Sequence, residues 1–567
     1  MMVLRYINGV AGPKPMAIPA EHDPSSPMNR KDQTFPHLSE EMAARLVKYG
    51  TEEVVPSGTL LFSRGERRVD YFFVIEGNIE VYDFHEDGSR NIFVVHGPSQ
   101  FTGEVDLLSD RQIMVNGRTG AETRLVRIDT AHFRKLISGE PDIGEIIMRA
   151  FILRRVGLIQ SGQGGVVLAG SAHAADTVRL RIFLIRNGYP YRLLDTDVDA
   201  DVRHLIDGFG LDPSECPVVI MPDRRVLRCP TTAALAEELG ITIELDPDHV
   251  HDVAVIGAGP SGLAAAVYAA SEGLDTLVLE ALAPGGQAGT SSKIENYLGF
   301  PTGISGQGLA GRAHVQALKF GARMAVARAV EGMDCSSQPY RLKLDDGTTV
   351  SARSVVIATG ARYRKLEHVD YERFEGQGIN YAATAMEATL CSGEEVVVVG
   401  GGNSAGQAAV FLARTVAHVH ILVRSGGLAA TMSDYLVQRI AQSPRITLHT
   451  HCQIDHLDGD AYLREVGWKC INGTQVRKKI GSVFVMIGAE PNTAWLQGCL
   501  DLDRKGFVLT GRDDNGHATA SPYATTLRGV FAVGDVRSGS VKRVASGVGE
   551  GSVVVQAVHR FLHPSPV

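Results

Sequence analysis

The chain has 567 residues, which is long for one hydrophobic core, so we expect three or four domains. Its apolar content of 44% and charged content of 21% are those of an ordinary globular protein, and no apolar stretch suits a membrane span. A net charge of −8 without any Lys/Arg-rich run argues against nucleic-acid binding. We therefore expect a soluble, cytoplasmic protein.

The N-terminal residues and the cysteines exclude further classes. Residues 1–35 are rich in Pro, Ala and small polar residues and lack the apolar core of a signal peptide, so we predict a disordered arm. Met1 and Met28 both remain candidate starts. The two closest of the seven cysteines, Cys216 and Cys229, lie 13 positions apart, so the chain contains no CxxC, zinc pattern or secreted disulfide framework. We expect no metal site and a reducing compartment.

Residues 36–155 are predicted to form a β-rich domain. Ser39 is suited to cap a helix over Glu40 to Tyr49, and short strands separated by turns follow. The predicted strands are Leu60–Phe62, Tyr71–Ile75, Ile79–Phe84 and Asn91–Val95. The run from Tyr71 to Asp110 resembles a cyclic-nucleotide-binding domain, which implies a β-roll or jelly-roll fold.

The predicted ligand site of this domain departs from that resemblance. The family pattern has Gly and Glu followed nine residues later by an Arg that pairs with the cyclic phosphate. Gly103 and Glu104 match, with Glu104 placed for a ribose hydroxyl, but the Arg position holds Ile113. An isoleucine cannot bind a phosphate, and Arg111 could replace the Arg only in a rearranged loop. A nucleotide or protein ligand at 36–155 stays open, and we favour a structural or docking module.

Residues 162–245 are predicted to form a second, α/β domain. The predicted elements are a strand Val166–Ala169, a helix Asp176–Asn187, a strand Tyr191–Asp195, and a hairpin of Val218–Ile220 with Val226–Arg228. Their order resembles a glutaredoxin-like, thioredoxin-fold domain. Its CxxC would fall at Ala174 and Thr177, so dithiol chemistry is excluded there. Cys216, beside Pro217, is either reactive or a small buried apolar residue.

The first of two glycine-rich turns is Gly257-Ala258-Gly259-Pro260-Ser261-Gly262. A predicted strand, Val253–Ile256, precedes it and a predicted helix, Leu263–Glu272, follows, an arrangement that brings backbone close to a pyrophosphate. The next strand, Thr276–Leu279, ends at Glu280, which is spaced for an adenosine ribose hydroxyl. Further candidate cofactor-binding residues are Gly286, Gln287, Asn296, Thr359, Gly360, Gly534 and Asp535, the last suited to a ribitol hydroxyl.

The second glycine-rich turn is Gly400-Gly401-Gly402-Asn403-Ser404-Ala405, which follows a predicted strand Val396–Val399. The next predicted strand, His418–Val423, is followed by Arg424, and no Asp or Glu occurs from Val396 to Ser433. An Arg at this place suits a 2′-phosphate, which favours NADPH over NADH. Two dinucleotide sites in one chain indicate a flavin and a nicotinamide cofactor.

Together with Gly488-Ala489-Glu490-Pro491-Asn492-Thr493, these motifs resemble the thioredoxin reductase family over about 249–567. The resemblance implies an FAD-binding domain over 249–365 and 490–567, interrupted by an NADPH-binding domain at 366–489. Both would be Rossmann-like three-layer (ββα) domains, in a homodimer. It also implies that Arg543, Val544 and Ala545 lie against the flavin, with a backbone contact at the departing Val544.

One departure decides the predicted chemistry. The family carries Cys-Ala-Thr-Cys just before the second glycine turn, but this chain has Ala382 and Ala385 at the two cysteine positions. Cys391 is a weak candidate replacement, so the catalytic residue is unassigned. We favour an enzyme that passes electrons from flavin directly to an external small-molecule or protein acceptor. A flavin-based sensor, or thioredoxin reduction by an unconventional thiol, stays open.

Overall fold

The computed structural model describes residues 30–84, 89–161, 165–198, 217–223, 225–291, 293–368, 370–381, 383, 385–460, 462–496, 498–513 and 516–564. The chain divides into two compact units. The first comprises Met1–Ala172, Leu180–Leu245 and Leu318–Ala327, and the second comprises His173–Arg179, Asp246–Ala317 and Arg328–Val567, each as far as described. None of the helices in the described ranges has the length and apolar character needed to cross a membrane.

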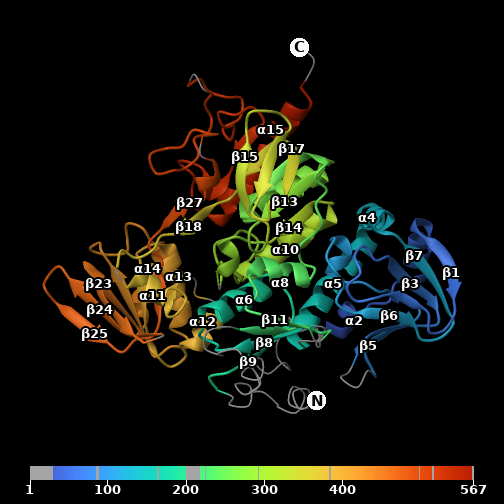
Figure 1. The fold of residues 1–567 in the computed structure, drawn as a ribbon, viewed down its shortest axis with the longest axis horizontal. Helices are drawn as coiled ribbons and strands as arrows, with labels where there is room; N and C mark the ends of the chain where they lie inside the picture. Colours follow the sequence, from blue (N-terminus) through green and yellow to red (C-terminus); the bar gives the residue numbers. More distant parts are fainter. Residues whose placement is uncertain are drawn as a thin grey trace. The chain divides into compact units, whose positions relative to one another are not determined.

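The N-terminal part of the first unit is built from antiparallel strands, coloured blue in Figure 1. They form two sheets, with strand orders β1-β7-β3 and β2-β6-β4-β5. The element bounds are α2 (Lys31–Thr34), α3 (Glu40–Leu46), β1 (Thr51–Val55), β2 (Leu60–Phe62), β3 (Tyr71–Glu76), β4 (Ile79–Phe84), β5 (Arg90–His96), β6 (Asn116–Thr119), β7 (Thr123–Ile128), α4 (Thr130–Gly139) and α5 (Pro141–Ser161). The predicted helix and the four predicted strands are confirmed.

Local signals explain how this part begins. The Ser39 hydroxyl accepts a hydrogen bond from the Met42 amide at 3.2 Å, so the predicted cap is confirmed. The predicted disordered arm extends too far, because Lys31–Thr34 form a helix and the Thr34 carbonyl accepts a 3.0 Å hydrogen bond from buried Arg154. Met1 and Met28 lie outside the described residues.

A small four-stranded sheet of order β11-β10-β8-β9 follows. Its elements are β8 (Val166–Gly170), α6 (Ala175–Arg186), β9 (Tyr191–Asp195), β10 (Val218–Ile220), β11 (Val226–Arg228) and α8 (Thr232–Glu238). β8 pairs in parallel with β9, and β10 and β11 form an antiparallel pair. The predicted β-α-β unit and hairpin are therefore confirmed, whereas Cys216 lies outside the described residues.

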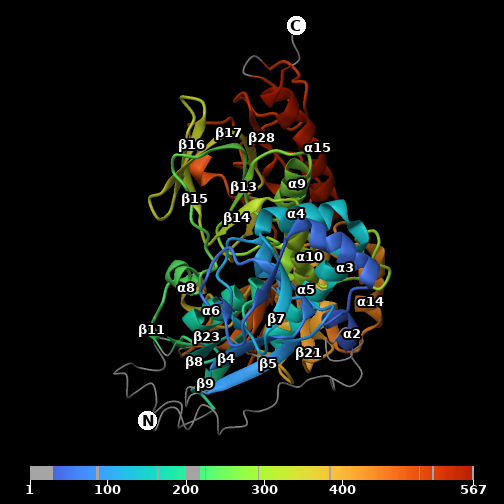
Figure 2. The ribbon, with the colours of Figure 1, turned by 90° about the vertical axis from the view of Figure 1, so that its right-hand side faces the viewer.

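The second unit contains a sheet that carries the first glycine turn, and it includes β13, β12, β17, β16 and β15 in that order. The bounds are β12 (Val250–Ile256), α9 (Pro260–Ser271), β13 (Thr276–Glu280), α10 (Gly306–Lys319), β15 (Val330–Asp334), β16 (Tyr340–Leu344), β17 (Thr349–Ile357), β28 (Val530–Ala532) and α15 (Val544–Leu562), while β14 (Arg323–Val326) belongs to the first unit. Figure 2 shows β28 beside β17 and α15 beside α9. The C-terminal segment thus completes a sheet that begins almost 300 residues earlier.

Small residues bring α9 and α15 together. A Cβ on Gly551 would lie 2.1 Å from the Ser261 carbonyl oxygen, and one on Gly547 would lie 2.5 Å from the Ser261 hydroxyl. A larger residue at either position would push the two helices apart. This close crossing holds the C-terminal helix beside the helix that follows the first glycine turn.

A second, parallel sheet carries the second glycine turn, in the order β19-β26-β20-β21-β22, and a separate antiparallel sheet has the order β23-β24-β25. The elements are α11 (Tyr371–Phe374), β19 (Ile379–Asn380), α12 (Ala385–Leu390), β20 (Glu395–Val399), α13 (Asn403–Leu412), β21 (His418–Val423), α14 (Asp434–Gln442), β22 (Ile446–Thr450), β23 (Cys452–Gly459), β24 (Leu463–Cys470), β25 (Gln475–Lys478) and β26 (Val483–Val485). The short strands β18 (Ala361–Tyr363) and β27 (Ala489–Pro491) pair where the chain leaves and rejoins the first sheet. The predicted strands on both sides of each glycine turn are confirmed.

The cysteines correct one expectation. Cys335 pairs with Cys499 and Cys452 with Cys470 as disulfides, so the absence of a disulfide framework, which we expected from the spacing, is contradicted. Cys452 and Cys470 face each other in the β23–β24 register, a proximity that only strand pairing creates. The spacing argument for a reducing compartment therefore loses its basis.

Candidate dinucleotide-binding sites

The three glycines of the first turn have different physical roles. Gly257 has φ +99°, and a Cβ there would lie 2.5 Å from the Ala358 carbonyl oxygen. A Cβ on Gly262 would lie 1.8 Å from the Gly257 carbonyl oxygen. Gly259 is different, because a Cβ there would meet only the Gly286 Cα, at 3.9 Å. Chain packing thus requires Gly257 and Gly262, whereas Gly259 leaves a space that a phosphate group fits.

The surroundings of this turn suit a dinucleotide. Gly259 is the N-cap of α9, and no described side chain accepts hydrogen bonds from the first amides of that helix, so its positive end is available to an anion. The Glu280 carboxylate accepts hydrogen bonds from the Ala258 amide at 2.7 Å and the Leu282 amide at 3.0 Å. These bonds hold a carboxylate beside the turn, where a ribose hydroxyl could reach it.

Two other predicted motifs are held in place by backbone contacts: the Gly285-Gly286-Gln287 segment lies against the first turn, and Thr359 is hydrogen-bonded to Asn492. The Gly285 amide donates to the Ala258 carbonyl at 2.7 Å, and a Cβ on Gly286 would lie 2.9 Å from the Gly259 Cα. Thr359 and Asn492 exchange two side-chain-to-backbone hydrogen bonds of 2.9 Å, which join the two crossing segments. The side-chain amide of Gln287 donates to the Ala361 carbonyl, whereas Asn296 is exposed on a loop.

A cavity of about 370 Å³ lies beside the turn. Pro260, Gly285 and Val544 line it, so three motifs that are far apart in the sequence contribute to one space. Its other lining residues are largely apolar and include Leu263, Val267, Tyr268, Tyr297 and Phe300. Among the predicted Arg543-Val544-Ala545 segment, only Val544 faces this space, while the other two side chains are exposed. An apolar cavity at a helix N-terminus fits a flat ring that carries polar edges.

Two charged residues that the sequence reasoning missed shape the C-terminal part of the site. Glu550, buried on α15, accepts a 2.6 Å hydrogen bond from the Gly534 amide and pairs with Arg537 at 2.6 Å. These contacts fix the turn that carries Asp535, and burial raises the pKa of the Asp535 carboxyl. The signal in the sequence that could have identified Glu550 is its position as the one acidic residue of the largely apolar, glycine-rich segment Val544–Leu562.

The second glycine turn repeats the geometry of the first. Gly400 has φ +139°, and a Cβ there would lie 2.3 Å from the Met486 carbonyl oxygen, whereas a Cβ on Gly402 would meet no described atom within 4 Å. Asn403 accepts a 2.7 Å hydrogen bond from the Ser433 amide, which anchors the start of α13. Arg424 is exposed directly after β21, which runs parallel to β20, so it lies at the same sheet edge as the turn. Of the remaining predicted residues, Ser404 is exposed, Ala405 is buried and Gly488 has φ +103°.

The thiol that remains near the second turn is inaccessible. Cys391 is 1% exposed and donates to the Glu387 carbonyl at 3.0 Å. Burial, reinforced by the charge of Glu394, raises the pKa of the Cys391 thiol to about 12. Such a thiol is neither ionised nor reachable at neutral pH, which argues against its redox role. Ala382 lies outside the described residues, and Ala385 begins α12.

The candidate nucleotide site of the N-terminal domain is filled by its own side chains. Arg155, from α5, donates to both oxygens of Glu104 at 2.9 Å and also pairs with Asp106. Burial raises the pKa of Glu104, whereas the charges of Arg155 and Arg111 overcome burial to lower that of Asp106. Ile113 packs against an apolar cluster, so the residue at the predicted phosphate position supplies no cation. The carboxylate predicted for a ribose is already paired internally.

Comparison with known proteins finds one family match in the C-terminal half of the chain and another in its N-terminal domain. Residues 251–551 match the Pyridine nucleotide-disulphide oxidoreductase family, and residues 52–140 match the Cyclic nucleotide-binding domain. The chain is 31% identical over 325 residues to NADPH-dependent thioredoxin reductase 3 of Arabidopsis thaliana, covering 55% of this chain but only 58% of that protein. It is 32% identical over 315 residues to the thioredoxin reductase of Chlamydia pneumoniae, covering 54% of this chain and 97% of that protein.

Solved structures lead to the same family. The thioredoxin reductase of Lactococcus lactis aligns with a TM-score of 0.51 and 29% identity, over 55% of this chain and 99% of that one. Because the family match covers more than half of its residues, the chain belongs to the pyridine nucleotide-disulphide oxidoreductase family. It is an FAD-dependent NAD(P)H oxidoreductase of the thioredoxin reductase type, and that type uses FAD and NADPH.

Proposed function

We propose that this enzyme accepts hydride from NADPH onto FAD and then passes electrons from the flavin directly to an external acceptor. The observation that carries this proposal is the lack of a usable dithiol near the second glycine turn. Ala382 and Ala385 replace both cysteines of the family segment, and Cys391 is buried with a raised pKa. Transfer through a disulfide requires one thiolate to attack and a second to resolve, and alanine can do neither.

The proposed FAD site uses the residues that surround the first turn. FAD supplies the redox-active ring, and the protein binds and orients it. The open face at Gly259 and the N-terminus of α9 would receive the pyrophosphate, Glu280 a ribose hydroxyl, and Asp535 the ribitol chain. The cavity lined by Pro260, Gly285 and Val544 would hold the ring in apolar surroundings and limit access of water.

The proposed NADPH site uses the second turn. The open face at Gly402 and the N-terminus of α13 would receive the pyrophosphate. Arg424 would pair with the 2′-phosphate, and the lack of any acid from Val396 to Ser433 removes a competing interaction with the 2′-hydroxyl of NADH. The exposure of Arg424 implies a modest preference for NADPH. We also propose a homodimer, on the basis of family membership.

A direct experiment is to reduce the enzyme with NADPH without oxygen and then to offer acceptors one at a time. We expect fast reoxidation by at least one of a quinone, a ferredoxin or oxygen, and slow reoxidation by thioredoxin or a small disulfide. Rapid, saturable reoxidation by thioredoxin would refute direct transfer. Reduction by NADPH without turnover on any acceptor would instead favour a flavin-based sensor.

A further inference from the structure

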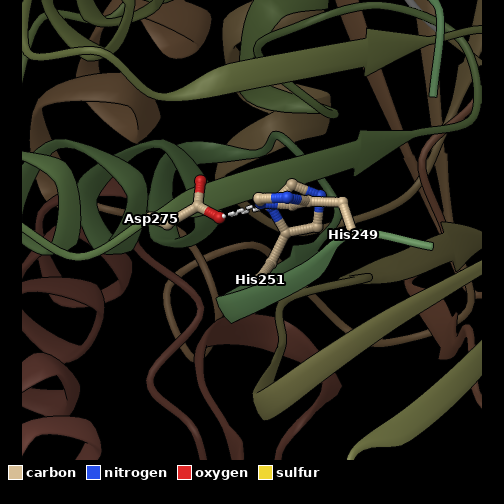
Figure 3. A group of neighbouring side chains, drawn as sticks. All are labelled: His249, His251 and Asp275. Atoms are coloured by element: carbon tan, nitrogen blue, oxygen red, sulfur yellow. Dashed lines mark hydrogen bonds and ion pairs between the residues drawn. The ribbon is translucent and has the colours of Figure 1, made fainter. Parts of the chain in front are cut away.

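Three side chains that could bind a metal ion converge at the edge of the first sheet. His249 directly precedes β12, His251 is the second residue of that strand, and Asp275 directly precedes β13. Asp275 Oδ2 lies 2.6 Å from His249 Nε2 and 2.9 Å from His251 Nδ1. Figure 3 shows both imidazole rings directed at the same carboxylate oxygen. One ligand atom from each residue lies within 4.8 Å of the other two.

The sheet topology brings these residues together. β12 pairs in parallel with β13, so the residues at the starts of the two strands lie at the same edge of the sheet. Val253 is opposite Thr276, so Asp275 lies level with Asp252, the residue that directly follows His251. The glycine turn follows the other end of β12, and this cluster is therefore separated from the dinucleotide site by the length of the strand. Its chemistry belongs to neither of the proposed cofactor sites.

We propose that His249, His251 and Asp275 bind a divalent transition-metal ion of the zinc type. Two imidazole nitrogens and one carboxylate oxygen are a ligand set that zinc accepts, whereas magnesium and calcium prefer oxygen ligands. Ligand atoms around a tetrahedral zinc ion lie about 3.3 Å apart, so the two hydrogen bonds need to lengthen by only several tenths of an ångström. Each neutral imidazole would keep its proton on the nitrogen that does not bind the metal.

The side chains of His249 and Asp275 are partly exposed to solvent, so an ion can reach the cluster. The His249 side chain is 47% exposed and that of Asp275 39%, whereas His251 is 2% exposed. The buried ring provides a fixed ligand, and the open side leaves a place for water as the fourth ligand. The nearby Asp252 pairs with Arg353 at 2.8 Å and accepts a hydrogen bond from the Asp275 amide, so it holds the strand ends in place. A bound ion would cross-link the segment before β12 to β13.

The test uses the full-length, tag-free protein with its flavin, stripped of metals with a chelator. Equilibrium dialysis against zinc chloride or magnesium chloride is compared for wild type, His249→Ala and Asp275→Asn, with bound metal measured by elemental analysis. His132→Ala is the matched control, because His132 makes a similar 2.7 Å contact with Asp129, yet the described residues gather no third ligand there. FAD content reports whether each variant is folded.

We expect wild type and His132→Ala to bind one zinc ion per chain with equal affinity and no magnesium. His249→Ala and Asp275→Asn should bind zinc at least about tenfold more weakly, and zinc should raise the unfolding temperature of wild type and His132→Ala but not that of these two variants. Zinc affinity unchanged in both variants, or no saturable zinc binding in wild type, would overturn the proposal. Should Asp275→Asn fail to retain FAD, the exposed His249→Ala variant alone decides between these results.

Discussion

At the scale of single residues, the glycines of the two turns separate into those required by the chain and those required by a ligand. Gly257, Gly262 and Gly400 leave no room for a Cβ, because each would collide with a carbonyl oxygen of the protein. Gly259 and Gly402 would tolerate a Cβ without any such collision. A substitution at the second group therefore tests the cofactor and not the fold.

Gly259→Val should fold yet lose FAD, because the new side chain occupies the space proposed for the pyrophosphate. We expect FAD affinity to fall by roughly tenfold or more, or about 1.4 kcal/mol. Gly402→Val is its matched control, which should keep FAD while the KM for NADPH rises. Circular dichroism checks the fold, and absorbance at the flavin band measures FAD per chain. Full flavin content in Gly259→Val would remove this turn from the FAD site.

Arg424 should decide between the two nicotinamide cofactors. Arg424→Ala is expected to raise the KM for NADPH by roughly threefold to tenfold, the modest effect of an exposed charge pair, and to leave NADH almost unchanged. Steady-state kinetics of wild type and Arg424→Ala with NADPH and with NADH measure how much the KM for each cofactor changes. An equal change for NADPH and NADH would show that Arg424 does not contact the 2′-phosphate.

At the scale of elements, α5 determines what the N-terminal domain can bind. Its Arg155 pairs with Glu104 and Asp106, and these buried charges compensate one another. A ribose hydroxyl would have to compete with Arg155 for the oxygens of Glu104, and weakening a buried ion pair is costly. This arrangement favours a structural or docking module over a nucleotide receptor.

Cyclic AMP and cyclic GMP should therefore bind the full-length protein weakly or not at all. The missing phosphate cation at Ile113 alone costs about 2–5 kcal/mol, or roughly thirtyfold to several thousandfold in affinity. Titration calorimetry of the full-length protein with each cyclic nucleotide measures its dissociation constant. Micromolar binding would contradict it, and its loss in Arg111→Leu would identify Arg111 as the substitute cation.

The sequence predicted those elements whose signals are local. The cap at Ser39, the hairpin of Val218–Ile220 with Val226–Arg228, and the strands on both sides of each glycine turn depend on neighbouring residues, and all are confirmed. The features it missed depend on contacts between distant segments. Cys335 and Cys499 are 164 positions apart, and the partners of Glu550 and Asp275 are set by helix and strand packing. Spacing along the chain carries no information about such pairs.

At the scale of the whole molecule, the family scaffold is retained while the cysteine pair of the family segment is replaced by alanines. The relatives are named thioredoxin reductases, but this chain lacks the paired cysteines before its second glycine turn. The described residues contain one free cysteine, Cys391, and it is buried. Among the described residues, Cys335–Cys499 and Cys452–Cys470 form disulfides, and any measurement of stored electrons has to account for them.

The most direct test of the central claim is an anaerobic titration of the enzyme with NADPH, followed by flavin absorbance. Our account predicts that one equivalent of NADPH per FAD completes the reduction, because electrons are stored on the flavin alone. Cys335→Ser, Cys391→Ser and Cys452→Ser should each leave this stoichiometry unchanged. Consumption of two equivalents, with loss of the second in one of these variants, would contradict direct transfer and identify the thiol that stores the additional electrons.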